Sequence, residues 1–178
     1  GAAVVEPFDD RRVIAGQGTA AIELMAQVPS LGLLLAPVGG GGLLSGTALA
    51  AQTVRGQQPV VVGVEPVAAD DTFRSFVVGR RQLVDTPDTI ADGLRTSVGK
   101  LTFPIIQRHV ERIVTVSERS IVMAMRMLWE RLKIVVEPSG AVPLAALIEG
   151  KLNPGTARTG IILSGGNVDL ERLPWMRD

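Results

Sequence analysis

The stretch that decides the fold is Pro37-Val38-Gly39-Gly40-Gly41-Gly42-Leu43-Leu44-Ser45-Gly46. It ends the apolar run 31–38 and leads directly into a helix-like segment that begins at Leu43. This order predicts a strand, a glycine turn and a helix start, an arrangement in which free backbone N–H groups and the helix dipole converge on one anion. Because successive glycines have no side chains, the backbone can close around a phosphate. The stretch therefore predicts a phosphate site.

The glycine run also has two other interpretations. Glycine-rich turns between a strand and a helix serve close helix packing as well as phosphate binding. Nucleotide binding is disfavoured, because no Lys-Ser/Thr pair follows the last glycine as it does in a Walker loop. The dinucleotide fingerprint G-x-G-x-x-G does not fit either. Gly40, Gly42 and Gly46 are spaced G-x-G-x-x-x-G, with one residue too many before the last glycine.

Composition and charge exclude several classes of partner. The chain has 178 residues, of which 46% are hydrophobic, enough to bury the core of one domain. The net charge of zero gives no electrostatic basis for binding nucleic acid or an anionic membrane, and 3% aromatic residues leave few stacking platforms for single strands. Cysteine is absent, which excludes disulfides and thiolate metal sites. No apolar run reaches the length of about 20 residues that spans a bilayer. The N-terminus lacks a basic region followed by an apolar one, so we expect a soluble, cytoplasmic protein.

Short aliphatic runs alternate with helical patterns along the whole chain. The runs that predict strands are Ala3 to Val5, Leu31 to Val38, Val60 to Val64, Ile113 to Val116 and Gly160 to Leu163. The segments that predict helices are Thr19 to Gln27, Leu43 to Val54, Ala69 to Val78, Phe103 to Val110, Ser117 to Leu132 and Ser139 to Glu149. Several strands are apolar throughout, as in a parallel sheet buried on both faces, so the class is α/β.

Polar residues follow three of the predicted strands. The glycine run, Glu65 and Ser164 each lie at a carboxyl end, where ligands sit in such sheets, so we expect them to share one crevice. Ser164-Gly165-Gly166-Asn167 offers a hydroxyl and an amide that would position a neutral hydrogen-bond partner. The same four residues are also typical of a simple turn.

The segment Glu65-Pro66-Val67-Ala68-Ala69-Asp70-Asp71 places two carboxylates six positions apart. Together with a backbone carbonyl of the intervening turn they would suit a hard cation, Mg²⁺ or Ca²⁺, because both prefer oxygen ligands. The alternative is that Asp70 and Asp71 are only an acidic pair at a helix start, where the dipole stabilises them.

Seven motifs, taken together in order and spacing, resemble the fold-type II pyridoxal-phosphate (PLP) enzymes of the threonine dehydratase and serine racemase family. They cover nearly the whole chain: Pro7-Phe8-Asp9-Asp10, Ile14 to Thr19, Pro37 to Gly46, Gly63-Val64-Glu65-Pro66, Thr89 to Gly93, Val136 to Ala141 and Leu163 to Asn167. The resemblance implies a three-layer fold, a mostly parallel twisted sheet with helices on both faces, incomplete in this chain.

The resemblance also implies roles for single residues. The cofactor phosphate would be held by backbone N–H groups of Gly39, Gly40, Gly41, Gly42 and Leu43. Ser164 would face the pyridine nitrogen. A hydroxyl at that nitrogen does not enforce a protonated ring, which suits elimination and racemisation at the α and β carbons. Glu137 corresponds to the family's acidic residue near the ring, and Gly93 to a backbone contact there. Without the resemblance, Glu137 is a helix-start acid and Gly93 a turn residue.

The acidic segment matches the family as well. Serine racemases and related dehydratases bind Mg²⁺ or Ca²⁺ through a glutamate, an alanine carbonyl and an aspartate with the spacing of Glu65, Ala69 and Asp71. Waters would complete the shell of this implied site.

Two segments of the family are missing from the chain. One carries the Schiff-base lysine in an S-F-K-x-R-G motif, and the other is the small domain that binds the substrate carboxylate. The lysines present, Lys100, Lys133 and Lys151, do not match that motif. We expect residues 1–178 to form a single domain, the carboxyl-terminal part of the large PLP-binding domain, with no catalytic residue of its own. It would be inactive alone and would pair with the missing segment or with a second copy in a dimer.

Three function classes remain at this point. The first is part of a PLP-dependent threonine/serine dehydratase, an ammonia-lyase that converts a small-molecule amino acid to a 2-oxo acid and ammonia, with serine racemase or hydroxyaspartate dehydratase as the alternative. The second is a non-catalytic module that binds a phosphate ligand or acts as a subunit. The third, nucleotide binding, is disfavoured by the glycine spacing.

Overall fold

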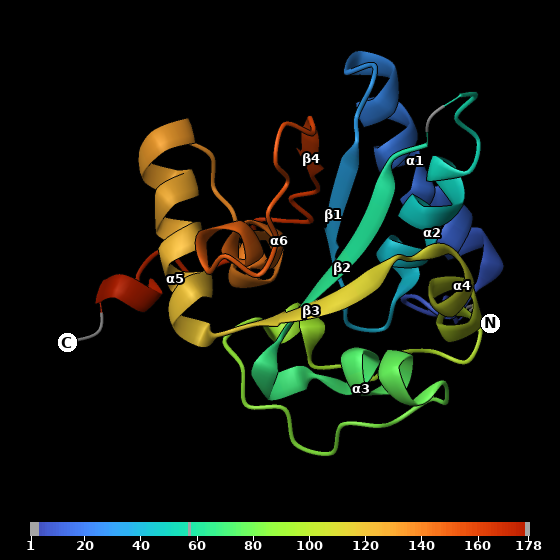
Figure 1. The fold of residues 1–178 in the computed structure, drawn as a ribbon. Helices are drawn as coiled ribbons and strands as arrows, with labels where there is room; N and C mark the ends of the chain where they lie inside the picture. The colour runs from blue at the N-terminus through green and yellow to red at the C-terminus, as the bar shows by residue number, and fades with distance from the viewer. Residues whose placement is uncertain (1–3, 57, 177–178) are drawn as a thin grey trace.

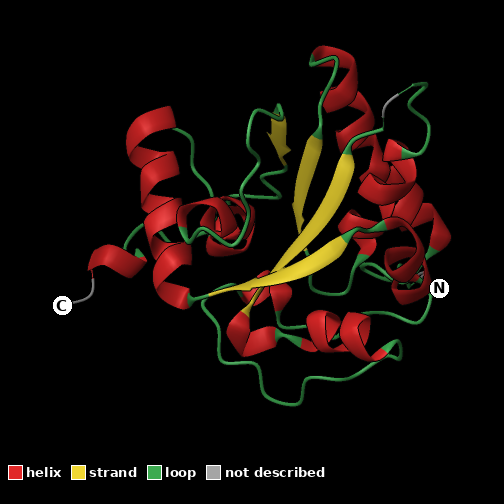
Figure 2. Cartoon of the chain, in the orientation of Figure 1, coloured by secondary structure: helices red, strands yellow, loops and turns green. Residues whose placement is uncertain are grey.

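The fold is a parallel sheet enclosed between two layers of helices. The computed structural model describes residues 4–56 and 58–176. Within them, four parallel strands lie in the order β3-β2-β1-β4, and Figures 1 and 2 show their strong twist. The strands are β1 (Leu33–Pro37), β2 (Val60–Pro66), β3 (Arg112–Val116) and β4 (Thr159–Ile161). The predicted α/β class with a parallel sheet is confirmed.

One face of the sheet is covered by α1 (Arg11–Gln27), α2 (Gly42–Ala51) and α4 (Thr102–His109), and α3 (Asp71–Val78) packs beside α4 near β3. The other face is covered by α5 (Glu118–Met127) and α6 (Pro138–Ile148), as Figure 1 shows. Because side chains alternate along a strand, Leu34 of β1 packs in the core beneath α1, α2 and α4, and Leu35 packs in the core beneath α5 and α6. The sheet is thus buried on both faces, which explains why its strands are apolar throughout.

Three short helical segments adjoin these elements. They are η1 (Val67–Ala69), η2 (Asp92–Leu94) and η4 (Pro174–Met176), and a π-helical turn, Leu128–Leu132, follows α5. The single helix predicted from Ser117 to Leu132 is therefore an α-helix with a wider last turn, which Lys133 closes with a left-handed backbone of φ 59°.

Among the predicted elements, one helix start and one strand differ most from the structure. The helix predicted from Thr19 begins at Arg11 instead, because the carboxylate of Asp10 accepts the Arg12 N–H at 2.7 Å and caps the helix there. The predicted strand Ala3 to Val5 is not found: Ala3 lies outside the described residues, and Val4 and Val5 are exposed and outside the sheet.

The crossing of α1 and α2 depends on two glycines. A side chain at Gly46 would meet the backbone of Ile14 and would approach the backbone nitrogen of Gly18 to 2.5 Å, so the two helix backbones are in direct contact. The glycine run is therefore followed by the close helix packing that one of its interpretations predicts.

We expect Gly46→Ala to lower the free energy of unfolding by about 1–3 kcal/mol, because neither backbone can move away without opening the core. Urea denaturation measures this. Gly16→Ala on α1 is the matched control, since nothing lies within 4 Å of a side chain there and alanine favours the helix. Equal effects of the two substitutions would contradict the packing argument.

No helix in the described part of the chain is both long and apolar enough to traverse a lipid bilayer.

Candidate functional site

A cavity of about 400 Å³ lies at the carboxyl ends of β1 and β4. The chain runs from β1 to β2 and β3 on one side and returns through α5 and α6 to β4 on the other, so this is the topological switch point of the sheet, where open α/β folds bind ligands. All eight residues predicted for the cofactor line it: Gly39, Gly40, Gly41, Gly42, Leu43, Gly93, Glu137 and Ser164.

The glycine loop, residues 39–42, forms one wall of the cavity and begins α2. Gly41 has a left-handed backbone with φ 90°, and a side chain at Gly39 would lie 2.9 Å from the Cα atom of Leu94. Within the described residues, no acceptor bonds the backbone N–H groups from Gly39 to Leu44. The loop is thus a cradle of free donors at a helix N-terminus, the arrangement that binds an anion.

The start of α6 forms a second wall. The hydroxyl of Ser139, which is buried, accepts the N–H of Gly93 at 3.1 Å and so joins η2 to α6. A side chain at Gly93 would lie 3.1 Å from that hydroxyl oxygen, so only glycine lets the two segments approach this closely.

The Ser164-Gly165-Gly166-Asn167 turn is held by Glu137. The Glu137 carboxylate accepts the N–H of Asn167 at 2.7 Å, and the Glu137 N–H donates to the carbonyl of Gly165 at 3.0 Å. A side chain at Gly165 would lie 3.1 Å from the same carboxylate. Glu137 therefore has a structural partner as well as a place at the cavity, and Ser164 lies exposed beside it.

The cavity is also lined by residues that were assigned no site role from the sequence, among them Phe8, Thr96 and Ser139. Phe8 and Ser139 belong to two of the seven ordered motifs, and this was the signal available for them. No pattern in the sequence pointed to Thr96.

Glu65 does not share this crevice, contrary to the prediction. Its side chain is fully buried at the end of β2 and is not part of the cavity wall. The reason is the direction of the side chain: one carboxylate oxygen of Glu65 accepts the N–H of Phe73 in α3 at 2.6 Å, which anchors it beside that helix.

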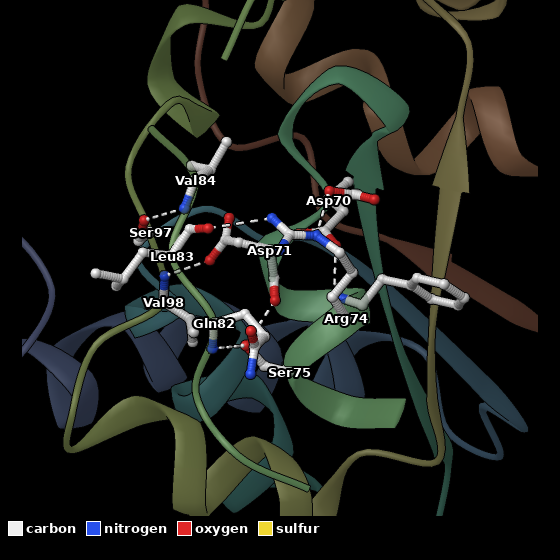
Figure 3. A network of polar contacts seen from close by, with 11 residues as sticks. Asp70, Asp71, Arg74, Ser75, Gln82, Leu83, Val84, Ser97 and Val98 are labelled. Carbon is white, nitrogen blue, oxygen red and sulfur yellow. Dashed lines mark hydrogen bonds and ion pairs between the residues drawn. The ribbon is translucent and has the colours of Figure 1, made fainter. Parts of the chain in front are cut away.

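Asp71, at the start of α3, is the second buried acid of this region. One of its oxygens accepts the N–H of Val98 at 2.8 Å, and its carbonyl accepts the hydroxyl of Ser75, as Figure 3 shows. Within the described residues, the second oxygen of Asp71 and the second oxygen of Glu65 have no hydrogen-bond partner. Burial raises the pKa of Asp71 to about 6. Burial also raises the pKa of Glu65 well above its ordinary value, and the charge of Asp71 adds to that rise.

The acid pair fits a divalent cation on these grounds. Two unpartnered, buried carboxylate oxygens are costly unless a positive charge faces them. Ala69, also buried, lies between the two acids in the chain and offers its carbonyl. No cluster of three or more His, Cys, Asp or Glu side chains that could hold a metal occurs in residues 4–56 and 58–176. A cation here would therefore depend on two carboxylates, a carbonyl and water, a set that suits Mg²⁺ or Ca²⁺.

Comparison with known proteins gives a consistent result. Residues 1–165 match the family model described as pyridoxal-phosphate dependent enzyme. The chain is 48% identical over 174 residues to serine racemase of Dictyostelium discoideum, and 47% identical over 171 residues to beta-hydroxyaspartate dehydratase of Paracoccus denitrificans. Among solved structures, T.th. threonine deaminase superposes with a TM-score of 0.85 at 51% identity, over 92% of this chain and 60% of that one.

The two curated relatives are longer than this chain. Each match covers 96% of the chain, but only 53% of the racemase and 54% of the dehydratase. The chain therefore spans about half the length of the curated relatives it matches.

Proposed function

The chain belongs to the pyridoxal-phosphate dependent enzymes of fold type II, and from this premise we propose that it forms the phosphate-, ring- and cation-binding part of an ammonia-lyase or racemase of 3-hydroxy amino acids. The names of the relatives support the substrate class, since serine, threonine and hydroxyaspartate all carry a hydroxyl on the β carbon. Threonine dehydratase is not favoured over serine racemase or hydroxyaspartate dehydratase, which fit at least as well.

The observation that carries the proposal is the convergence at the switch point. Free N–H groups of the glycine loop at the start of α2, the hydroxyl of Ser164 after β4 and the carboxylate of Glu137 before α6 line one cavity of about 400 Å³. Segments far apart in the chain thus place a phosphate cradle and the Ser164 hydroxyl, a neutral donor or acceptor, on the wall of one cavity.

Each group has a distinct task in this proposal. The glycine loop binds the phosphate and fixes the cofactor's position, while Ser164 meets the ring nitrogen without imposing a proton on it. Glu137 holds the Ser164 turn in place through its bond to Asn167. When bound, pyridoxal phosphate supplies an electron sink for negative charge at the α carbon of an amino acid.

The acid pair has a supporting task. A divalent cation between Glu65 and Asp71 would neutralise both charges and fix the start of α3 against the segment around Val98. The orphaned oxygens of the pair support this assignment.

The test is turnover by the complete natural protein that contains this chain. We expect release of ammonia and a 2-oxo acid, or inversion to the D-amino acid, from at least one of L-serine, L-threonine and L-threo-3-hydroxyaspartate when pyridoxal 5'-phosphate is present. The chain by itself is expected to show no turnover, since none of its lysines lines the cavity.

Two outcomes would contradict the proposal. Turnover by the chain alone would show that the catalytic machinery lies within it. Binding of pyridoxal 5'-phosphate without turnover of any 3-hydroxy amino acid by the complete protein would favour the second candidate, a phosphate-ligand module without catalysis.

A further inference from the structure

The carboxylate of Asp9 accepts hydrogen bonds from a segment more than ninety positions along the chain. One oxygen accepts the N–H of Lys100 at 2.9 Å, and the other accepts the N–H groups of Leu101 at 2.8 Å and Thr102 at 3.2 Å. Thr102 is the first residue of α4, and Lys100 and Leu101 lead directly into it; Leu101, at the cap position, has no side chain that could bond these N–H groups. Asp9, near the N-terminus, therefore caps α4 in the middle of the chain.

The helix start that Asp9 caps also bonds to the glycine loop. The buried hydroxyl of Thr102 donates to the carbonyl of Gly40 at 2.7 Å, and the N–H of Gly99 donates to the same carbonyl at 3.1 Å. A carbonyl oxygen that faced the cavity would repel an anion. These two bonds hold the Gly40 carbonyl at α4, while the N–H groups of the loop stay without an acceptor in the described part of the chain.

The loop is supported from a second side by the neighbouring residue. A side chain at Gly40 would collide with the ring of Phe8, and one at Gly42 would lie 3.0 Å from the Cβ atom of Phe8. Phe8 and Asp9, two consecutive residues before α1, thus contact the loop directly and through α4.

We propose that Asp9 is a positioning residue for the glycine loop: by capping α4 it keeps Thr102 on the Gly40 carbonyl and the loop in its phosphate-binding shape. The inference rests on the proposed phosphate role of the loop. It assigns to Asp9, within the motif Pro7-Phe8-Asp9-Asp10, a function that the cavity lining alone does not reveal, since Asp9 does not line the cavity.

The structure supplies a matched control, Asp10. It is also an aspartate that caps a helix, α1, through the N–H of Arg12, and it bears the same charge one position along the chain. Asp10 has no bond to α4 or to the glycine loop among the residues that the structure describes. Loss of Asp10 therefore reproduces the loss of a cap and a charge without the proposed effect on the loop.

The first measurement uses no ligand and follows backbone amide shifts and hydrogen exchange by NMR. In Asp9→Ala, the amides of residues 99–102 should lose protection and those of residues 40–43 should shift. In Asp9→Asn both changes should be smaller, because one side-chain oxygen can still accept from Leu101 and Thr102. In Asp10→Ala the amides of residues 40–43 should keep their wild-type positions.

The second measurement titrates inorganic phosphate and pyridoxal 5'-phosphate, with pyridoxal as the probe that lacks a phosphate. If the loop of Asp9→Ala adopts its binding shape for only a tenth of the time, the affinity of this variant for both phosphate probes falls about tenfold. We expect a fall of about threefold in Asp9→Asn and of less than about twofold in Asp10→Ala. Pyridoxal affinity should stay within about twofold in all three variants.

The two measurements separate the possible failures. If the wild-type protein binds neither phosphate probe, the proposed function of the loop fails, and with it the binding consequence of this inference. If the wild-type binds and Asp9→Ala binds equally well, or if the amides of residues 40–43 do not shift, the positioning role of Asp9 is wrong while the proposed function stands. A parallel loss of phosphate and pyridoxal affinity would indicate general unfolding and would also overturn it.

Discussion

Gly41→Ala is expected to abolish measurable binding of pyridoxal 5'-phosphate and to destabilise the fold. Gly41 has φ 90°, and a Cβ atom there would lie 2.8 Å from the Cδ1 atom of Ile106 and 2.9 Å from the Thr102 hydroxyl. The backbone conformation costs alanine about 1–2 kcal/mol. The overpacked contact adds about 1–3 kcal/mol, so the loop is expected to leave its cradle shape rather than keep both strains.

Gly56→Ala is the matched control for this substitution. Gly56 has φ 94°, nearly the same backbone conformation, but nothing lies within 4 Å of a side chain there and it does not line the cavity. We expect only the backbone cost of about 1–2 kcal/mol and unchanged ligand affinity. Urea denaturation and calorimetric titration with pyridoxal 5'-phosphate measure both effects, and wild-type affinity in Gly41→Ala would refute the assignment of the loop.

Without a divalent cation, the protein is expected to become less stable as the pH rises from about 4 to about 6. In this window the folded chain keeps a proton on Asp71, whose pKa is raised to about 6, while the unfolded chain has lost it. The folded state then binds more protons, so the free energy of unfolding falls as the pH rises. Burial of Glu65 raises its pKa as well and extends the loss to higher pH. For Asp71 alone the loss is on the order of 2 kcal/mol, since one pKa unit corresponds to about 1.4 kcal/mol.

Mg²⁺ or Ca²⁺ is expected to reverse this loss. At neutral pH a cation at about one hundred times its dissociation constant stabilises the protein by about 2.7 kcal/mol. For a chain of this size that corresponds to a rise in Tm on the order of 5–10 °C. Thermal unfolding at pH 5 and pH 7.5, with chelator or with added cation, measures both effects in one series.

Two aspartates at adjacent positions make this test specific. Asp71→Asn should remove the pH dependence that Asp71 causes and weaken the response to cation. Asp70→Asn should change both much less, because Asp70 is partly exposed, forms an ion pair with Arg74 at 2.8 Å, and its charge is only a minor cause of the raised pKa of Asp71. A Tm that does not respond to either cation in the wild-type protein would show that the acid pair is no cation site.

Much of the fold could be predicted because its signals are local. Strands buried on both faces must be apolar, and the runs ending at Val38 and beginning at Val60 carried that signal. The boundaries were less accurate where a cap replaced a periodic pattern. The start of α1 depends on the side chain of Asp10, and residues 11–18, between this start and the predicted one, show no apolar period.

The candidate site could be predicted in its composition but not in its grouping. All eight predicted cofactor residues line one cavity, whereas Glu65, expected in the same crevice, lies buried beside α3. The end of a strand places a residue at the edge of the sheet, but it does not determine the direction of the side chain. The roles of Asp9 and Thr102 could not be predicted. Asp9 bonds to residues more than ninety positions away and Thr102 to one more than sixty positions away, and such distant bonds leave no pattern in the sequence.

The sequence by itself determined the α/β class, the order of strands and helices from α1 onward, and the glycine turn at residues 39–42. These follow from side-chain periodicity and from the backbone freedom of glycine, which act over a few neighbouring residues. The tertiary structure alone decided which strand ends meet at the switch point, which acids are buried together, and how Asp9 and Thr102 support the glycine loop. These depend on packing between distant segments, where the contact distances and the access of water are set by the whole fold.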